Sequence, residues 1–319
     1  MESEILISVQ ELSRYYGQQR GIENVSFNVH RGEILGFLGP NGAGKSTTMQ
    51  IISGILAANH GSVSIAGRDI NEAPQKAKQH IGFLPEQPPL YTDLTVDEYL
   101  NYAAKLRGIK KQELNEAVKV SKKRCGLENT GARLINNLSK GYKQRVGIAQ
   151  AIIHSPSVII LDEPTSGLDP IQIREIRELM RELGEDHSVI LSTHILSEVQ
   201  SLCDRVLIIN QGNIVLDQSL SQLQNNDEKP GSIEISLRNP PALEDLLNID
   251  GVASAESINE NILRINFNPD VDATDKIVEK AVSDNWGLYK LNPADTSLET
   301  IFMQLTYGDQ SAEEIKNVQ

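Results

Sequence analysis

The octapeptide GPNGAGKS, residues 39–46, constrains the fold of this 319-residue chain more than any other feature. It fits the pattern G-x-x-x-x-G-K-[ST] at every fixed position, and it stands between an apolar run, GEILGFLG, and a helical pattern, STTMQIISGIL. Glycines allow successive backbone N–H groups to turn towards an anion, and the N-terminus of the following helix adds the positive end of its dipole. The order of strand, glycine-rich loop and helix therefore predicts an α/β fold with a phosphate-binding loop.

The side chains of this loop indicate a nucleotide that carries several phosphates. We expect Lys45 to reach the β- and γ-phosphates, Ser46 to ligate Mg²⁺ and Thr47 to donate to a phosphate oxygen. A dinucleotide site is disfavoured because the loop does not complete G-x-G-x-x-G. The expected nucleotide contacts in this loop are Gly39, Pro40, Asn41, Gly42, Ala43, Gly44, Lys45, Ser46 and Thr47.

The segment VIILDEP, residues 158–164, places two carboxylates directly after a buried-looking strand. Phosphoryl transfer needs a carboxylate for the metal ion and a group that orients water. Asp162 can hold Mg²⁺, and Glu163 can polarise a water molecule. An isolated Asp-Glu pair more often caps a helix, but the apolar residues before it and the phosphate-binding loop elsewhere favour the catalytic interpretation.

Hydrophobic periodicity predicts a large first domain over residues 1–222. Strand patterns occupy residues 5–12 and 24–30, and a helical period runs from Thr95 to Leu127 with a break at Arg107-Gly108. SVIILDEP and HSVILSTH are typical of buried parallel strands flanking the helix IQIREIRELMREL, and VLIINQGNIVL is typical of a hairpin. We expect a helical subdomain at about residues 88–155.

A smaller second domain is predicted after a polar linker. Residues 223–231, which end in Pro230-Gly231, read as the linker, and residues 232–308 follow with the order βαββαβ and a terminal helix. That order resembles a ferredoxin-like module. Residues 309–319 are expected to form a flexible tail.

Charge and apolar content exclude some classes of protein. The net charge is −13, and the chain from residue 229 onwards contains 7 Lys+Arg against 16 Asp+Glu, so nucleic-acid binding is disfavoured. No stretch approaches the roughly 18–20 apolar residues of a spanning helix, and Cys125 and Cys203 lack the spacing of a thiol or zinc site. We therefore expect a soluble protein of a reducing compartment, whose membrane role, if any, requires a partner.

One basic stretch departs from this acidic balance. It could be a solvated helical face, or it could meet a partner or lipid headgroups; the first alternative is the commoner for such a run. Its residues are Lys105, Arg107, Lys110, Lys111, Lys119, Lys122, Lys123 and Arg124.

Taken together, these motifs resemble the nucleotide-binding subunit of ABC transporters over nearly all of residues 5–220. The resemblance implies an ABC-type P-loop ATPase with a mixed core sheet, an antiparallel β subdomain and a helical subdomain. It matches Gly39–Thr47 to the Walker A loop and Asp162 to the Walker B metal ligand. ATP and Mg²⁺ are the implied cofactors.

The same resemblance assigns roles to residues whose chemistry is ambiguous when they are read alone. Tyr16 is similar to the aromatic residue that stacks on adenine, Glu163 to the catalytic base and His194 to the switch histidine. Asp169 ends SGLD, which resembles the D-loop, and LSKGY at 138–142 resembles the family signature. Without the resemblance, Tyr16 would more often be a packing residue and His194 an ordinary histidine.

The signature implies a second copy of the cassette. In the family, its serine and glycine face the γ-phosphate held by the opposite subunit, so Ser139 and Gly141 are expected to complete a site in another chain. The commonest family form is LSGGQ, but LSKGY keeps these two positions. A homodimer and a pairing with a related ATPase both remain open.

The Q-loop departs more from the family pattern. The glutamine position falls at Glu86, with Gln87 beside it, in FLPEQPPLY. A carboxylate can still ligate Mg²⁺ or a bridging water, so both residues stay candidates. In the family this loop and the helical arm after it meet the membrane subunit.

FLPEQPPLY, LSKGY and the C-terminal SLETIFMQLT resemble the export branch for drugs, polysaccharides and lipids, which includes gliding-motility-type ATPases. This predicts an ATPase that powers export through a separate polytopic permease subunit, on the inner face of the cell membrane. The alternative is a soluble ABC-type ATPase acting on ribosomes or DNA, although such proteins typically have two cassettes or coiled-coil insertions. The second domain could be structural or could sense a ligand.

Overall fold

The computed structural model describes residues 4–225, 232–259, 261–268, 271–293, 298–299, 301–303 and 305–306. The chain divides after Ser219 into two compact units. Each unit has a hydrophobic core of its own.

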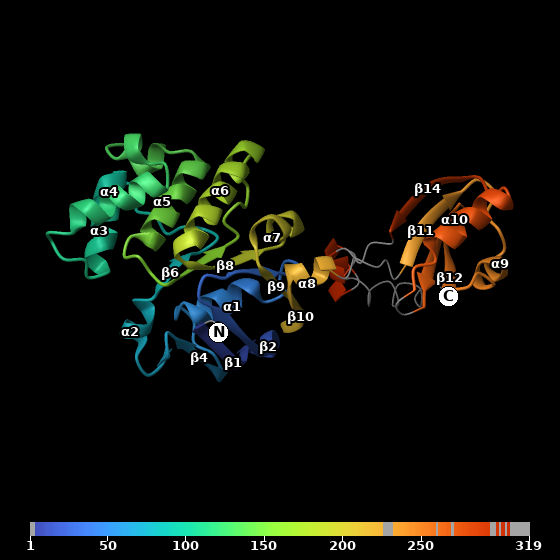
Figure 1. The fold of residues 1–319 in the computed structure, drawn as a ribbon. Helices are drawn as coiled ribbons and strands as arrows, with labels where there is room; N and C mark the ends of the chain where they lie inside the picture. The colour runs from blue at the N-terminus through green and yellow to red at the C-terminus, as the bar shows by residue number, and fades with distance from the viewer. Residues whose placement is uncertain are drawn as a thin grey trace. The chain divides into compact units, whose positions relative to one another are not determined.

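The first unit contains two β-sheets (Figure 1). An antiparallel sheet has the order β2-β1-β4-β5, and a six-stranded sheet has the order β10-β9-β3-β8-β7-β6. In the larger sheet β3, β6, β7, β8 and β9 are parallel, whereas β10 pairs antiparallel with β9 as the predicted hairpin. The strands are β1 (Ile5–Tyr16), β2 (Gln19–His30), β3 (Ile34–Leu38), β4 (His60–Ile65), β5 (Arg68–Asp69), β6 (Ile81–Leu84), β7 (Val158–Asp162), β8 (Ser188–Thr193), β9 (Arg205–Asn210) and β10 (Asn213–Ser219).

Among the helices of this unit, α1 lies on one face of the larger sheet and α5, α6 and α7 lie on the other (Figure 1). They are α1 (Lys45–Ile52), α2 (Pro74–Lys78), α3 (Val96–Leu106), α4 (Leu114–Arg124), α5 (Lys140–Ile152), α6 (Pro170–Asp186) and α7 (Leu196–Leu202), with short 3₁₀ turns at Glu128–Thr130 and Ile135–Asn137. Helices α3, α4 and α5 pack against one another as a helical subdomain.

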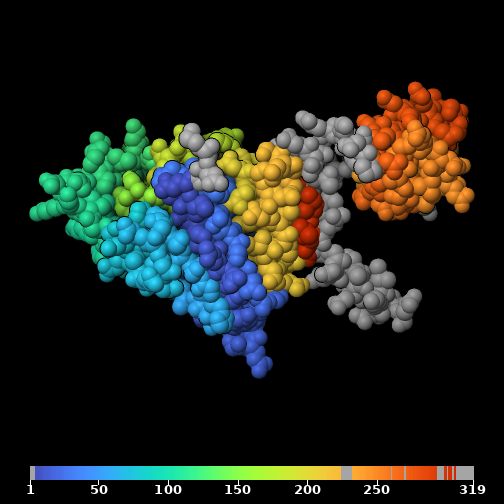
Figure 2. All heavy atoms as spheres, turned by 60° about the horizontal axis from the view of Figure 1, so that its bottom comes forward, coloured from blue at the N-terminus to red at the C-terminus, as the bar shows by residue number. Residues whose placement is uncertain are grey.

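Helix α1 lies between the two sheets. Its buried side chains, among them Met49 and Ile52, join one core with residues of β1, β2 and β4 and with residues of β3, β7 and β8. Figure 2 shows β1 and β2 (dark blue) directly beside β9 and β10 (yellow), and β10 packs against β2. The loop before α1 is therefore held by both sheets.

Helix ends explain where the expected elements stop. The predicted helix over residues 46–56 was too long, because α1 ends at Ile52 and Gly54 adopts a left-handed φ of 69° that a helix cannot continue through. The predicted break at Arg107-Gly108 is confirmed, with Gly108 at a φ of 77°. Helix α3 begins with a capping box in which the Thr95 hydroxyl accepts from the Glu98 backbone and Glu98 accepts from the Thr95 backbone.

The second unit begins with α8 (Leu220–Asn225), which includes residues 223–225 of the predicted linker; residues 226–231 lie outside the described part. Its remaining elements are β11 (Ser232–Leu237), α9 (Leu243–Leu247), β12 (Val252–Asn259), β13 (Ile262–Phe267), α10 (Thr274–Ser283) and β14 (Leu288–Pro293). The antiparallel sheet order β12-β13-β11-β14 is that of a ferredoxin-like fold, as predicted. The described residues of the expected terminal helix at 297–306 are helical.

Both cysteines are core residues: Cys125 and Cys203 are buried, and burial raises the pKa of the Cys125 thiol to about 12. Within the described residues, no helix combines the length and apolarity that a membrane span requires.

Candidate functional site

A cleft of about 530 Å³ opens beside the phosphate-binding loop. Its wall joins the loop and the start of α1 to the turn between β1 and β2 and to the ends of β6, β7 and β8. It is lined by Tyr16, Gln19, Arg20, Gly21, Asn41, Gly42, Gly44, Lys45, Ser46, Thr47, Glu86, Glu163, Ser166 and His194. The carboxyl ends of parallel strands thus bring together side chains that are far apart in the sequence, as in other α/β sheets.

The phosphate-binding loop is closely packed against the rest of the sheet. A Cβ atom at Gly39 would lie 2.4 Å from the carbonyl oxygen of Ile209, so a larger residue does not fit there. Lys45 is 5% exposed, and its ammonium donates to the carbonyl oxygens of Gly39, at 2.8 Å, and Pro40, at 3.2 Å. Lys45 is the first residue of α1, so its charge and the positive end of the helix dipole both attract an anion to the same place.

Glu163 connects Lys45 to His194. One carboxylate oxygen, Oε2, lies 2.8 Å from Nδ1 of His194, and the other, Oε1, lies 3.3 Å from Nζ of Lys45. The second contact is an ion pair by distance but not a hydrogen bond, so Oε1 is without a hydrogen-bond partner among the described residues. A buried carboxylate oxygen with unused acceptor capacity is suited to accept a proton or to orient water.

The backbone at Glu163 is strained. Its φ is 48°, a left-handed conformation that costs a residue with a side chain about 1–3 kcal/mol. The N–H of Glu163 donates to the carbonyl of Ser192 at 2.9 Å, which fixes the residue beside the end of β8. Such strain persists where the surrounding structure holds it, and it often marks functional sites.

Asp162 lies at the end of β7, opposite Ser192 in the parallel register with β8. It is 2% exposed, and its Oδ1 accepts from the Ser192 hydroxyl at 2.7 Å. The Ser192 hydroxyl thus fixes Oδ1 of Asp162, and Oδ2 is available to a metal ion or to water.

The residues at this site fit a magnesium ion that is shared with phosphate oxygens. Ser46 and Glu86 line the cleft, and Asp162 is adjacent to Glu163. Among the described residues, no group of three or more histidine, cysteine or acidic side chains is arranged as a metal site. Mg²⁺ typically takes only one or two protein ligands beside substrate phosphates, so this donor set suits it.

Tyr16 also lines the cleft. The residue is 46% exposed, and the guanidinium of Arg14 lies over its ring, 5.1 Å from the ring centroid. Arg14 is in turn anchored to the carbonyl of Ala57 at 3.1 Å. A Cβ at Gly21 would come within 2.9 Å of the Tyr16 ring, so the backbone there lies against the ring edge.

The signature and Asp169 lie away from this cleft. The Ser139 hydroxyl caps α5 by accepting from the N–H of Tyr142 at 3.4 Å, and Asp169 caps α6 by accepting from the N–H groups of Ile171 and Gln172. Gly141 and Asp169 line a different cleft, of about 450 Å³. Within one chain Ser139 and Asp169 therefore act as helix caps, Gly141 is buried against the Gln172 side chain, and the structure does not bring these residues to the phosphate-binding loop.

Comparison with known proteins identifies the cassette. A family model for ABC transporters matches residues 22–166. The bacitracin transport ATP-binding protein BcrA of Bacillus licheniformis is 32% identical over 306 residues, which cover 95% of this chain and 98% of the relative. The chain belongs to the ATP-binding subunits of ABC transporters.

Solved structures of ABC cassettes agree with the fold. An ATP-binding subunit of an ABC transporter matches with a TM-score of 0.63 and 34% identity, over 69% of this chain and 92% of that one. The cassette MJ0796, a dimer bound to ADP and Pi, matches with a TM-score of 0.61 and 25% identity, over 67% of this chain and 99% of that one. The protein is accordingly an ATP-binding and ATP-hydrolysing subunit of an ABC transporter.

Several residues of this ABC cassette site were not predicted. Gln19, Arg20 and Gly21 also line the cleft, as does Ser166, the first residue of the expected D-loop, for which no place in this cleft was predicted. Arg20 follows Tyr16 by four residues. A cation so close in the sequence to an expected base-stacking residue could have indicated that Arg20 belongs to the nucleotide site. Between the two Q-loop candidates, Glu86 lines the cleft and Gln87 is absent from its lining among the described residues.

A larger cavity than this cleft lies elsewhere in the ABC cassette. It has a volume of about 660 Å³ and lies between α4 and the C-terminal ends of α5 and α6. Among the described residues, none of the phosphate-binding loop lines it. We therefore assign nucleotide binding to the smaller cleft, because the cations, hydroxyls and carboxylates that the chemistry requires lie there.

Proposed function

We propose that ATP hydrolysis in the 530 Å³ cleft powers export of a substrate through a separate polytopic permease subunit. The single observation that carries this proposal is the position of Glu163 in the cleft wall, in contact with both Lys45 and His194. A cation, a general base and a histidine are thus assembled around the point where a γ-phosphate would lie.

Each side chain of the cleft has a role in this proposal. Lys45 binds the β- and γ-phosphates, Glu163 aligns and polarises the attacking water, and His194 orients Glu163 through the 2.8 Å contact. The backbone of Gly39–Thr47 cradles the phosphates, and Tyr16 stacks on adenine. Catalysis then consists of positioning and of stabilising charge.

Magnesium completes the site in this proposal. Ser46, Asp162 and Glu86 would hold the ion, directly or through water. When bound, Mg²⁺ neutralises charge that develops on the phosphate oxygens. We assign the Q-loop role to Glu86 on the evidence of its place in the cleft wall.

A second subunit supplies the remaining contacts. Ser139 and Gly141 lie at the N-terminus of α5, whose dipole favours an anion, and neither lines the phosphate cleft of its own chain among the described residues. We infer an ATP-dependent dimer, of two identical chains or with a related ATPase, in which each signature faces the partner's γ-phosphate and each Asp169 lies at the dimer interface. The dimeric MJ0796 cassette supports this arrangement.

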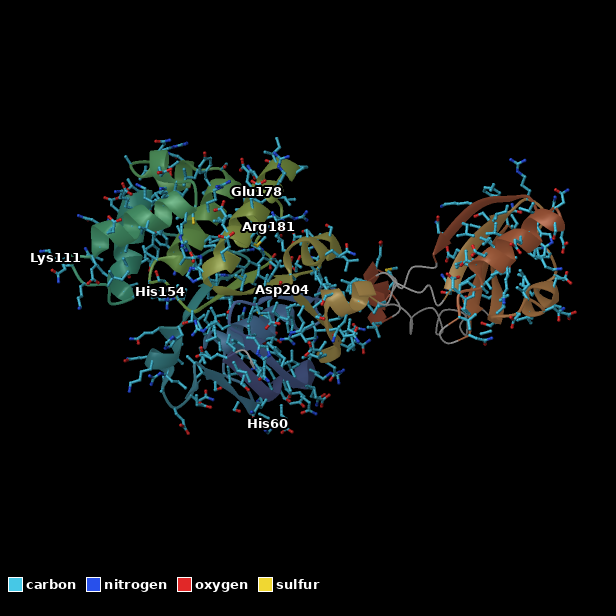
Figure 3. All side chains as sticks on the ribbon, viewed as in Figure 1. His60, Lys111, His154, Glu178, Arg181 and Asp204 are labelled. Carbon is cyan, nitrogen blue, oxygen red and sulfur yellow. The ribbon has the colours of Figure 1, made fainter. Side chains whose placement is uncertain are left out.

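The permease is proposed to bind the helical subdomain beside Glu86. Tyr91 and Tyr102 are 54% and 41% exposed there, and they pack together with ring centroids 5.6 Å apart. Exposed aromatic pairs of this kind are typical of protein interfaces. Lys111, in the basic stretch, lies at the outer end of the same subdomain (Figure 3). Such contacts would hold the protein on the cytoplasmic face of the cell membrane.

For the second domain, we favour a structural or docking role over ligand sensing. The proposed boundaries remain residues 1–222 for the ATPase domain, 223–231 for the linker and 232–308 for the accessory domain. The outward side chains of the accessory sheet include Arg264, which pairs with Glu234 at 2.7 Å and with Glu256 at 3.4 Å. A face whose charges are already paired suits solvent or a polar partner better than a small apolar ligand.

The test of ATP hydrolysis is Glu163→Gln in the full-length protein. We expect the variant to bind ATP and to hydrolyse it at least roughly 100-fold more slowly than wild type, because the general base is lost. Wild-type turnover in the variant would remove Glu163 from this role.

The test of the transport role is co-purification from gently solubilised membranes. We expect a polytopic membrane protein in near-equal amount. Recovery with ribosomes or DNA instead would support the alternative of a soluble ABC-type ATPase.

A further inference from the structure

Helix α7 carries a carboxylate that is completely enclosed. Glu198 is 0% exposed, yet it lies outside the lining of the nucleotide cleft among the described residues. Its Oε1 accepts from the hydroxyl of Thr165 at 2.6 Å, and its Oε2 accepts from the hydroxyl of Thr193 at 2.7 Å. Arg177 on α6 supplies the countercharge, with Nη2 at 3.5 Å from Oε1.

The two threonines belong to the two segments that carry the reacting groups. Thr165 follows Glu163 by two residues in the turn after β7, and Thr193 directly precedes His194 at the end of β8. One carboxylate therefore ties both segments together, each through a different oxygen. The hydroxyl of Thr193 also accepts from the N–H of Ile195 at 3.0 Å, which extends the connection to the residue after His194.

The backbone conformation of Glu163 requires a tertiary contact that holds its loop in place. Glu163 has a left-handed φ of 48°, so its loop does not hold this conformation by local preference. The contact between Glu163 and His194 joins the same two segments on the side that faces the cleft. Glu198 joins the same two segments through residues that do not line the cleft among the described residues.

Stability alone does not account for a charge in this place. Burying a carboxylate carries a desolvation penalty, and well-packed apolar residues of similar volume often replace buried ion pairs without loss of stability. Each carboxylate oxygen of Glu198 accepts from a different hydroxyl, which an apolar side chain could not do.

We propose that Glu198 is a positioning residue for ATP hydrolysis, which fixes Glu163 against His194 by holding Thr165 and Thr193. This inference rests on the proposed roles of Glu163 and His194. It assigns Glu198 no contact with nucleotide, so its loss affects turnover and leaves nucleotide affinity unchanged.

The first experiment changes only a hydroxyl. Thr165→Val keeps the shape of the side chain and removes the bond to Glu198, whereas Thr165→Ser keeps the hydroxyl. We expect Thr165→Val to lower kcat roughly 10- to 100-fold, as misplacement of a reacting group does, with the Kd for ATP within about twofold of wild type. Thr165→Ser should retain most of the wild-type kcat. Equal kcat values in Thr165→Val and wild type would overturn the proposal.

A second experiment separates positioning from stability. The triple variant Thr165→Val, Thr193→Val and Glu198→Leu replaces the carboxylate and its two hydroxyl partners with apolar groups, while Arg177 keeps its contact with the Ser197 hydroxyl at 3.3 Å. Its Tm is compared with that of Glu198→Ala. We expect the triple variant to recover Tm but not kcat. Recovery of kcat together with Tm would mean that Glu198 only stabilises the fold. Gln200→Ala, on the exposed side of the same helix, serves as the control and should match wild type in both measurements.

Failure of this inference is distinguishable from failure of the proposed function. If wild type hydrolyses ATP and Glu163→Gln does not, a normal Thr165→Val variant counts against Glu198 alone. If Glu163→Gln hydrolyses ATP normally, the site assignment itself is wrong.

Discussion

Lys45 and Glu163 form a buried ion pair across the cleft, with Nζ 3.3 Å from Oε1 and side chains that are 5% and 8% exposed. The lysine is the residue proposed to bind phosphate, and the glutamate is the proposed base. A phosphate group and this carboxylate would therefore compete for one ammonium, and they would also repel each other.

We predict that Glu163→Gln binds ATP more tightly than wild type. Removing the negative charge is worth at least about 1 kcal/mol, the Coulomb energy of two unit charges about 4 Å apart in bulk water, which is at least roughly fivefold in Kd. Equilibrium binding of ATP without turnover would measure it. Glu178→Gln, on the exposed face of α6 (Figure 3), is the matched control and should leave Kd unchanged. A weaker affinity in Glu163→Gln would show that the two groups do not compete.

Arg14 is predicted to support adenine binding by holding the Tyr16 ring. Its guanidinium lies 5.1 Å from the ring centroid and is anchored by the Ala57 carbonyl. An exposed cation–π contact is worth about 0.5–1 kcal/mol, so Arg14→Met should weaken ATP binding roughly two- to fivefold. Because only the base contacts Tyr16 in this proposal, the affinity for tripolyphosphate should not change.

Competition of ATP and of tripolyphosphate against a fluorescent nucleotide separates these two effects. Arg68→Met, at an exposed position, controls for the loss of a positive charge. An equal loss of affinity for both ligands would mean that Arg14 acts through long-range charge and not through Tyr16.

His154 is predicted to make the first unit less stable in mild acid. Its Nε2 lies 3.1 Å from the carbonyl of Ile81, and burial lowers its pKa from 6.5 to about 4. Between these two pKa values the unfolded chain therefore binds more protons than the folded chain. The contribution of neutral His154 to the free energy of unfolding is complete above about pH 6.5 and is lost as the pH falls towards 4. Between pH 7.5 and pH 5 the loss should be about 2 kcal/mol.

Urea unfolding at these two pH values measures this effect. His154→Gln should lose less stability on acidification than wild type. His60, which is exposed at the start of β4 (Figure 3), offers the control His60→Gln with a wild-type pH dependence. An unchanged pH dependence in His154→Gln would assign the acid sensitivity to another group.

The capping box at Thr95 is predicted to stabilise the helical subdomain. The Thr95 hydroxyl accepts from the Glu98 N–H, and Thr95→Ala leaves that donor without its partner. We expect a loss of about 1 kcal/mol, seen as a fall of roughly 2–4 °C in Tm by calorimetry. Thr95→Ser should behave as wild type, and a fall of the same size in that variant would point to the lost methyl group instead.

The local features of this fold could be predicted from the sequence because they depend on neighbouring residues. The glycine pattern of the phosphate-binding loop, the apolar strands before it and before Asp162, and the helix break at Gly108 all express short-range preferences. The early end of α1 was missed because Ile55 and Leu56 continue the apolar pattern, although Gly54 turns the backbone out of the helix.

The sequence by itself determined which residues are able to bind phosphate and to activate water, since motif spacing fixes their place on a strand end or a helix start. Only the tertiary structure decided their partners. Strand β8 pairs in parallel between β3 and β7, and this long-range pairing brings Ser192 to Asp162 and His194 to Glu163. The bonds from Thr165 and Thr193 to Glu198 depend in addition on how α7 packs against the sheet. Ser192 and Asp162, His194 and Glu163, and Thr165 and Glu198 are 30 or more residues apart in the chain. Such contacts arise from the packing of whole elements, which no local pattern encodes.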